Sequence, residues 1–222
     1  KMIDVANEKR YELPKVGGHQ AASTSSLHLN AALRFFVMRA WDHFAPTPHA
    51  APVYHAIEYL LGNLPKDALY RLRLNAFTPR SNMVETRQFA SLPRSVFSAW
   101  KEIEAEMLAE LPDIAVKEIE KIGLHSYPGM ADPDGVTIPT GSVGMGPAVT
   151  IALALVQQVL KAHRFNVPDS HFFAIVGDAE AEEGNLKEML PMVREFGISG
   201  VTHIMDYNRQ SLDTNIDESK VK

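Results

Sequence analysis

The sequence predicts an α/β fold in which a doubly wound, mainly parallel sheet carries helices on both faces. Two short apolar runs, 171–176 and 201–206, have the composition of buried parallel strands. The stretch 185–196 between them predicts a helix, so the three segments form a strand–helix–strand crossover. A third observation is the nearly unbroken apolar start of the predicted helix 148–163, which indicates a helix buried between other elements.

The composition is that of an ordinary globular protein. Its 222 residues are 45% hydrophobic and 22% charged, which suits one large domain or a domain with an appendage. The net charge is −5 and the basic residues are scattered, so a nucleic-acid partner is not expected. Cysteine is absent, which excludes disulfides, thiolate metal sites and a cysteine nucleophile. A metal ion would therefore need oxygen or imidazole ligands.

No membrane segment is expected either. The longest apolar stretch, 149–160, contains polar residues and is too short to cross a bilayer. The chain opens on Lys1 without a charged and then apolar leader. We expect a cytoplasmic protein, or one of an organelle matrix if a targeting segment has been removed.

The N-terminal part predicts an arm followed by helices. Residues 1–28 are expected to form an N-terminal arm and active-site loop, with a flexible turn just ahead of His19, and residues 29–222 to form the α/β domain. Apolar residues recur at helical spacing from Leu29 to Phe44, which predicts a helix there. A second helix is expected from Pro52 to about residue 61, preceded by a loop that holds His49.

The block from about 75 to 122 predicts a helical insertion. Residues 96–110 and 113–122 are rich in Glu, Lys, Ala and Leu and are typical of two exposed helices. Their charges are those of a solvated face, and docking to another subunit is the alternative. A Gly/Pro-rich loop at 123–147 then leads into the helix 148–163.

Oxygen-bearing side chains follow both predicted strands. Asp178 comes after the first strand and Asn208 after the second, and the backbone carbonyl of Gln210 lies close by in sequence. In crossover units, ligands bind beyond the carboxyl ends of the strands. Mg²⁺ prefers about six oxygen ligands, of which the protein often supplies only one or two. The pattern therefore predicts a magnesium site formed by Asp178, Asn208 and the carbonyl of Gln210.

These residues resemble a known family. The segment 177–180, followed thirty residues after Asp178 by Asn208, resembles the thiamine diphosphate (ThDP) signature, with Ala179 in place of its second glycine. The loop 139–147 is similar to the glycine loop of transketolases and of the decarboxylating component of homodimeric pyruvate dehydrogenases. Segments 18–19, 49–54 and 123–128 add three further anchors, of which the last two look most like the pyruvate dehydrogenase branch. The resemblance covers about residues 16–74 and 123–217.

The resemblance implies a role for each matching residue. His19 and His49 would flank the thiazolium ring and the substrate, with Tyr127 near cofactor or substrate. The glycine loop would allow the backbone close to the cofactor, with Val143 against the aminopyrimidine. Glu183 and Glu188 would lie towards a dimer interface, although they also suit a solvated helix start. The implied cofactor-binding residues are Val143, Gly144, Gly146, Gly177, Asp178, Ala179, Glu180 and Asn208.

The resemblance also implies an activity and partners. Our main expectation is ThDP- and Mg²⁺-dependent oxidative decarboxylation of a 2-oxoacid, with pyruvate as substrate and acyl transfer to a lipoyl-bearing acyltransferase. The alternatives are transketolase-like transfer of a two-carbon ketol unit between sugar phosphates, and a non-catalytic homologue with an assembly or regulatory role. A pyrimidine-binding domain would come from the rest of the polypeptide or another chain, and a homodimer is the expected assembly.

Overall fold

The computed structural model describes residues 2–7, 20–72, 124–125, 127–130, 132, 136–139, 141–208, 210–211 and 214–215. The chain divides into two compact units, one of residues 1–18 with 66–125 and the other of residues 19–65 with 126–222. The predicted helical insertion at about 75–122 lies outside the described residues. His19 lies outside them as well.

The described part of the first unit is small. It contains helix α1 (Met2–Asn7), the short 3₁₀ helix η3 (Lys66–Tyr70) and an isolated parallel bridge between Leu72 and Leu124. The side chains of Leu72 and Leu124 are buried.

The second unit contains a parallel sheet of three strands in the order β1 (His43–Ala45), β2 (Phe172–Gly177) and β3 (Val201–Asp206). In the register of the ladder, Ala45 pairs with Ala174 and Gly177 pairs with Asp206. Strands β2 and β3 match the predicted apolar runs to within one residue, and helix α7 (Gly184–Glu195) connects them as predicted. Strand β3 was predicted to be buried but has no buried residue, because it lies at the edge of this sheet. A small antiparallel pair, β4 (Gln210–Ser211) and β5 (Thr214–Asn215), follows.

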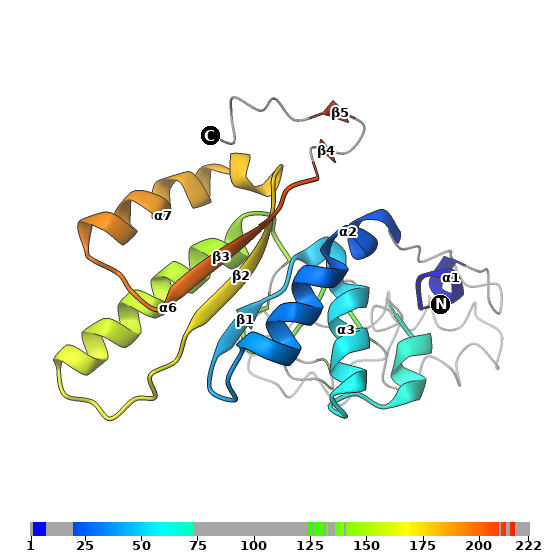
Figure 1. Cartoon of the computed structure of the whole chain (residues 1–222), viewed down its shortest axis with the longest axis horizontal. Helices are drawn as coiled ribbons and strands as arrows, with labels where there is room; N and C mark the ends of the chain where they lie inside the picture. The colour runs from blue at the N-terminus through cyan, green and yellow to red at the C-terminus, as the bar shows by residue number, and fades with distance from the viewer. Residues whose placement is uncertain are drawn as a thin grey trace, which may run out of the picture. The chain divides into compact units, whose positions relative to one another are not determined.

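Helices cover both faces of this sheet (Figure 1). Helix α6 (Met145–Ala162) and α7 pack on one face, and α2 (Gln20–Ala32) packs on the other. Helix α3 (Ala51–Leu60), entered through the 3₁₀ turn η2 (Pro48–Ala50), packs against α2. A further 3₁₀ turn, η6 (Glu180–Glu182), follows β2. The predicted doubly wound α/β fold is confirmed.

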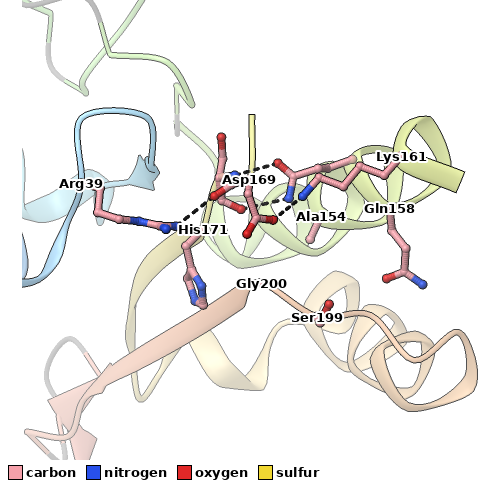
Figure 2. A pocket seen from close by; sticks show the side chains of 10 residues that line it. Arg39, Ala154, Gln158, Lys161, Asp169, His171, Ser199 and Gly200 are labelled. Carbon is pink, nitrogen blue, oxygen red and sulfur yellow. Dashed lines mark hydrogen bonds and ion pairs between the residues drawn. The ribbon is translucent and has the colours of Figure 1, made fainter. Parts of the chain in front are cut away.

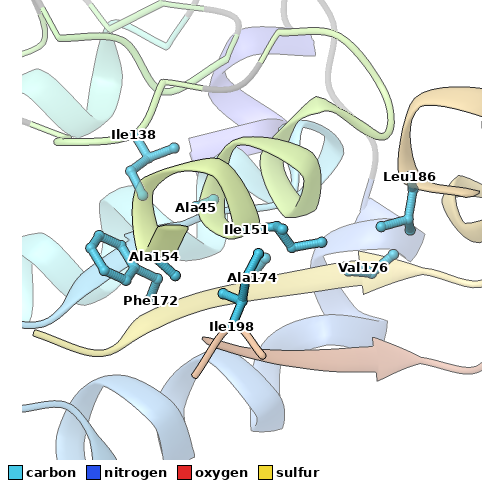
Figure 3. Close-up of a cluster of buried hydrophobic side chains, with 9 residues drawn as sticks. All are labelled: Ala45, Ile138, Ile151, Ala154, Phe172, Ala174, Val176, Leu186 and Ile198. Carbon is cyan, nitrogen blue, oxygen red and sulfur yellow. The ribbon is translucent and has the colours of Figure 1, made fainter. Parts of the chain in front are cut away.

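Strand β2 shows why this arrangement is stable. Its side chains alternate between two hydrophobic clusters, as the two-residue period of a strand requires. Phe172, Ala174 and Val176 lie in the cluster that includes Ile151 of α6 and Leu186 of α7 (Figure 3). Phe173 and Ile175 lie in the other cluster, with Leu33 and Phe44. Full burial of one such side chain stabilises the fold by about 1.5–3 kcal/mol, so β2 is fixed from both sides.

Helix α6 is long and apolar enough, by length and composition alone, to cross a membrane. Here it packs against β2 and α7 and contributes Ile151 and Ala154 to the core. The helix predicted at 148–163 begins earlier than expected, at Met145, and its buried residues lie in its first half, as far as Ala154.

The helix predicted from Leu29 to Phe44 is wrong in both of its bounds. Helix α2 already begins at Gln20, within the segment predicted as an arm, and it continues as the π-helix η1 (Leu33–Val37). The buried residues of α2 are the polar Ser23, Ser26 and Asn30, so no apolar period marks them. Ser26 and Asn30 instead bond to carbonyls one turn earlier. His43–Ala45 is a strand, because pairing with β2 overrides the local pattern.

Candidate functional site

The candidate site residues follow the carboxyl ends of the three parallel strands. Strand β1 leads to His49, β2 to Asp178 and β3 to Asn208. Because Gly177 pairs with Asp206, the β2 and β3 ends lie side by side. This is the edge at which ligands bind in open α/β sheets. The structure thus brings together the ends predicted to hold a metal.

Asp178 lies at the base of this edge. Its side chain is only 1% exposed, and Oδ1 accepts a hydrogen bond of 2.9 Å from the backbone N–H of Ala179. A buried carboxylate is costly unless it is paired, hydrogen-bonded or bound to a cation. The hydrogen bond from Ala179 helps to offset this cost, and the position of the carboxylate at the end of β2 suits a ligand of Mg²⁺.

The side chain of Asn208 is hydrogen-bonded to Ser25, which was not predicted from the sequence as a site residue. Its Nδ2 donates to the hydroxyl of Ser25 at 3.3 Å, and that hydroxyl donates to Oδ1 of Asp206 at 2.8 Å. The backbone N–H of Asn208 also donates to the carbonyl of Asp206, at 3.2 Å. Ser25 lies in α2, and only the packing of this helix beside β3 reveals its relation to the site.

Gln210 is the third residue predicted to bind the metal. It begins β4, where it pairs with Asn215. The structure therefore places its backbone two residues beyond Asn208, in an antiparallel pair rather than in the main sheet.

The glycine loop enters α6 through Gly144. This residue has φ +81°, in the left-handed region that favours glycine. A Cβ here would overlap Oδ1 of Asn185 and lie 2.7 Å from Cβ of Glu183. Gly146 is buried in the first turn of α6, and Val143 is half-buried beside it. Glycine at 144 is thus required by both backbone conformation and space.

Glu180 connects this loop to the end of β2. Its carboxylate accepts hydrogen bonds from the backbone N–H of Gly144 at 2.8 Å and from that of Gly177 at 3.2 Å. Burial raises the pKa of Glu180, the two N–H groups oppose this effect, and nearby Glu183 adds to the rise. Glu180, predicted to contact the cofactor, therefore organises the two segments that would do so.

Ala179 has φ −63° and ψ −34°, which is right-handed helical conformation. Any residue adopts this conformation without strain. The alanine that replaces the second glycine of the ThDP signature therefore costs nothing in backbone conformation.

His49 and Tyr127 form an aromatic pair. Their ring centroids are 6.1 Å apart and their planes are inclined by 80°. A Cβ placed at Gly141 would lie 3.8 Å from Cδ2 of Tyr127, so the tyrosine lies beside the glycine loop. Thr47 holds the segment before His49 against the sheet, because its hydroxyl donates to the carbonyl of Ile175 at 2.7 Å. Both His49 and Tyr127 are exposed, as residues that meet a ligand need to be.

Among the described residues, no group of three or more His, Asp or Glu side chains is placed to hold a metal ion. A magnesium site of the predicted kind does not need such a group. Mg²⁺ is commonly held by one or two carboxylates, and phosphate oxygens and water take up much of the rest of its shell. The donor set of one carboxylate, one amide and one carbonyl fits this pattern.

A separate hollow lies near the opposite, amino ends of the strands (Figure 2). Its cations are paired with acids: Lys161 with Asp169, and Arg39 with Asp42. Asp42 also accepts a hydrogen bond from the backbone N–H of His171 at 2.8 Å. Burial alone would raise the pKa of Asp42, but the bonds from Arg39 and His171 outweigh it and lower the pKa to about 2. These contacts fasten the start of β2 to its neighbours.

Comparison with known proteins matches residues 108–222, about half of the chain, to the family described as "Transketolase, thiamine diphosphate binding domain". The chloroplastic transketolase of Zea mays is 34% identical over 92 residues, which cover 39% of this chain and 14% of the maize protein. The transketolase of Bacillus subtilis is 28% identical over 97 residues, which cover 42% of this chain and 14% of that protein. The chain therefore matches only about one-seventh of the length of these relatives.

The matched residues 108–222 include the glycine loop, Asp178 and Asn208. The predicted cofactors, thiamine diphosphate with magnesium, are those of this family. The relatives are transketolases, so the comparisons confirm the superfamily predicted from the sequence and give no support to a special closeness to pyruvate dehydrogenase. The chain belongs to the transketolase thiamine diphosphate-binding domain family.

Proposed function

We propose that this chain binds the diphosphate of Mg²⁺–ThDP at the carboxyl edge of its sheet, within a transketolase-like enzyme that moves a two-carbon ketol unit between sugar phosphates. The observation that carries the proposal is the convergence of a buried Asp178 and Asn208 on two adjacent strand ends, both within the family-matched residues.

In this proposal, Asp178, Asn208 and the backbone carbonyl of Gln210 bind magnesium. The glycine loop, which leads into α6, contacts the cofactor. Gly144 and Gly146 admit the backbone close to it, and Val143 meets the aminopyrimidine. The support for this assignment is the fixed φ of Gly144 and the bond from its N–H to Glu180, which hold the loop against the end of β2.

The residues of this chain would bind the cofactor and the substrate and orient them. When bound, thiamine diphosphate accepts the electron pair of the bond that breaks beside a ketone carbonyl. His49 and Tyr127 would lie next to the thiazolium ring and the substrate, with His19 as a further contact. The support is that His49 and Tyr127 pack together next to the glycine loop. The exposed Glu183 and Glu188 would face a second copy of the protein.

Ketol transfer is favoured over 2-oxoacid decarboxylation because the relatives are transketolases of plants and bacteria. Pyruvate decarboxylation with acyl transfer to a lipoyl partner, our main expectation from the sequence, has no support from these relatives. A pyrimidine-binding domain, with the glutamate that activates the cofactor in the family, would be supplied by another segment or chain. Assays of the complete protein for ketol transfer between sugar phosphates and for CO₂ release from labelled pyruvate distinguish the two reactions.

Calorimetry with ThDP and Mg²⁺ tests the binding step. We expect Asp178→Ala to abolish magnesium-dependent ThDP binding, with a loss of at least about 100-fold in affinity. Asp169→Ala is the matched control, because its side chain is 87% exposed and lies in the hollow at the opposite edge. Unchanged affinity in Asp178→Ala would remove the metal assignment. Absence of any binding heat and thermal shift in the wild type would leave the non-catalytic alternative.

A further inference from the structure

The hydroxyl of Ser25 lies between two residues at the end of β3. It is 2.8 Å from Oδ1 of Asp206 and 3.3 Å from Nδ2 of Asn208. Ser25 comes from α2, outside residues 108–222 that match the family. Asn208 is exposed and lies two residues beyond the end of its strand, so the strand itself does not fix the orientation of its amide.

The hydrogen-bonding capacity of each group determines which way the amide faces. A serine hydroxyl has one hydrogen to donate, and a carboxylate can only accept. The hydrogen of Ser25 is therefore committed to Asp206, and towards Asn208 the hydroxyl oxygen can only accept. The amide must then present its NH₂ group to Ser25 and carry its oxygen on the other side.

We infer that Ser25 is a positioning residue, which orients the Asn208 amide so that its oxygen, and not its NH₂ group, is presented to magnesium. The inference rests on the proposed function of Asn208 as a metal ligand. An amide oxygen and an amide nitrogen have nearly the same shape, so a flipped amide would fit equally well but would direct hydrogens at the cation. Mutation of a residue that holds a metal ligand in the correct orientation commonly weakens metal binding by about 10–100-fold.

Ser25→Ala is the direct test. We expect it to weaken magnesium-dependent ThDP binding by about 10–100-fold in calorimetric titrations of Mg²⁺ at fixed ThDP. Ser25→Thr keeps the hydroxyl and should restore affinity to within about threefold of wild type. Thr24→Ala is the matched control, because Thr24 lies next to Ser25 on α2, is exposed and bonds to the carbonyl of Gln20. It should leave the Mg²⁺ titration unchanged.

A second background separates orientation from simple packing. In Asn208→Asp, both terminal atoms are oxygens, so turning the side chain over no longer replaces a ligand atom. Ser25→Ala should then cost less than about threefold in that background, although it costs about 10–100-fold beside Asn208. Melting temperatures measured without ligands show whether each variant is folded.

The outcomes are distinct. If the wild type binds Mg²⁺–ThDP but Ser25→Ala binds equally well, the inference is wrong and the proposed function stands. An equal loss beside the native Asn208 and in the Asn208→Asp background, or a loss that Ser25→Thr does not restore, would assign Ser25 a packing role and also overturn it. If the wild type does not bind Mg²⁺–ThDP, the proposed function and the inference fail together.

Discussion

The backbone N–H of Gly144 donates a 2.8 Å hydrogen bond to the buried carboxylate of Glu180. The same carboxylate accepts from the N–H of Gly177, so one side chain connects the glycine loop to the end of β2. Both segments belong to the proposed cofactor site. Their relative position is therefore set by the protein itself, and little ordering is left for the cofactor to impose.

Gly144→Ala tests whether the glycine loop requires glycine at position 144. The substitution forces a side chain into positive φ and into contact with Glu183 and Asn185, so we expect the free energy of unfolding to fall by about 3 kcal/mol. Gly62→Ala is the control, because Gly62 has φ +83° but no atom of the described residues within 4 Å of an added Cβ. It should cost only about 1 kcal/mol. Equal losses in urea denaturation would show that crowding at Gly144 is unimportant.

Glu180 should make stability depend on pH. Its raised pKa means that the folded protein keeps this proton to a higher pH than the unfolded chain, whose value is near 4.5. Between these two values the folded state binds more protons, so the free energy of unfolding falls as pH rises. In Glu180→Gln this contribution disappears. Urea denaturation at a series of pH values should show the wild type losing stability relative to the variant above about pH 4.5. A constant difference would contradict the raised pKa.

Ala179→Gly restores the family glycine and should bring no benefit. Because φ at this position is −63°, the glycine gains no conformation that alanine lacks. It adds freedom to the unfolded chain, and we expect a loss of about 0.5–1 kcal/mol in the free energy of unfolding. The dissociation constant for Mg²⁺–ThDP should change by less than about twofold. A clear gain in affinity would mean that the methyl group of Ala179 obstructs the diphosphate.

Asp42→Asn tests the contacts at the amino edge. The pKa of Asp42 is lowered to about 2, so its stabilising effect is complete above the unfolded value near 3.8 and is lost as pH falls through about 2. We expect the variant to be less stable by up to about 2 kcal/mol at about pH 7, with the difference vanishing towards about pH 2. Asp169→Asn, with an exposed carboxylate, should change little. Denaturation at about pH 7, 4 and 2.5 measures both.

The sequence was sufficient for the elements whose apolar pattern is local. Strand β3 and helices α3 and α7 have closely the predicted bounds, because apolar runs and Pro52 mark them. The convergence of Asp178 and Asn208 also follows from the sequence, since the carboxyl ends of neighbouring parallel strands share one edge. The thirty-residue separation of Asp178 and Asn208 along the chain leaves room for one crossover helix between the two strands.

Features that depend on distant partners were missed. Strand β1 has three residues and exists because it pairs with β2. The buried face of α2 is polar, so its start could not be read from hydrophobic spacing. For the same reason Ser25 gave no sign of its contact with Asn208, a residue 183 positions away. In each case the partner, rather than the local sequence, determines the structure.

Strand β1 has one more consequence, for the rate of folding. The bond between the N–H of His171 and Asp42 joins residues 129 positions apart, and the pairing of β1 with β2 spans a similar distance. Contacts between such distant segments form slowly, because the chain must lose much of its freedom before they form. The βαβ unit of β2, α7 and β3 involves shorter separations and should form first. The end of the sheet that leads to His49 would then be completed after the end that leads to Asp178 and Asn208.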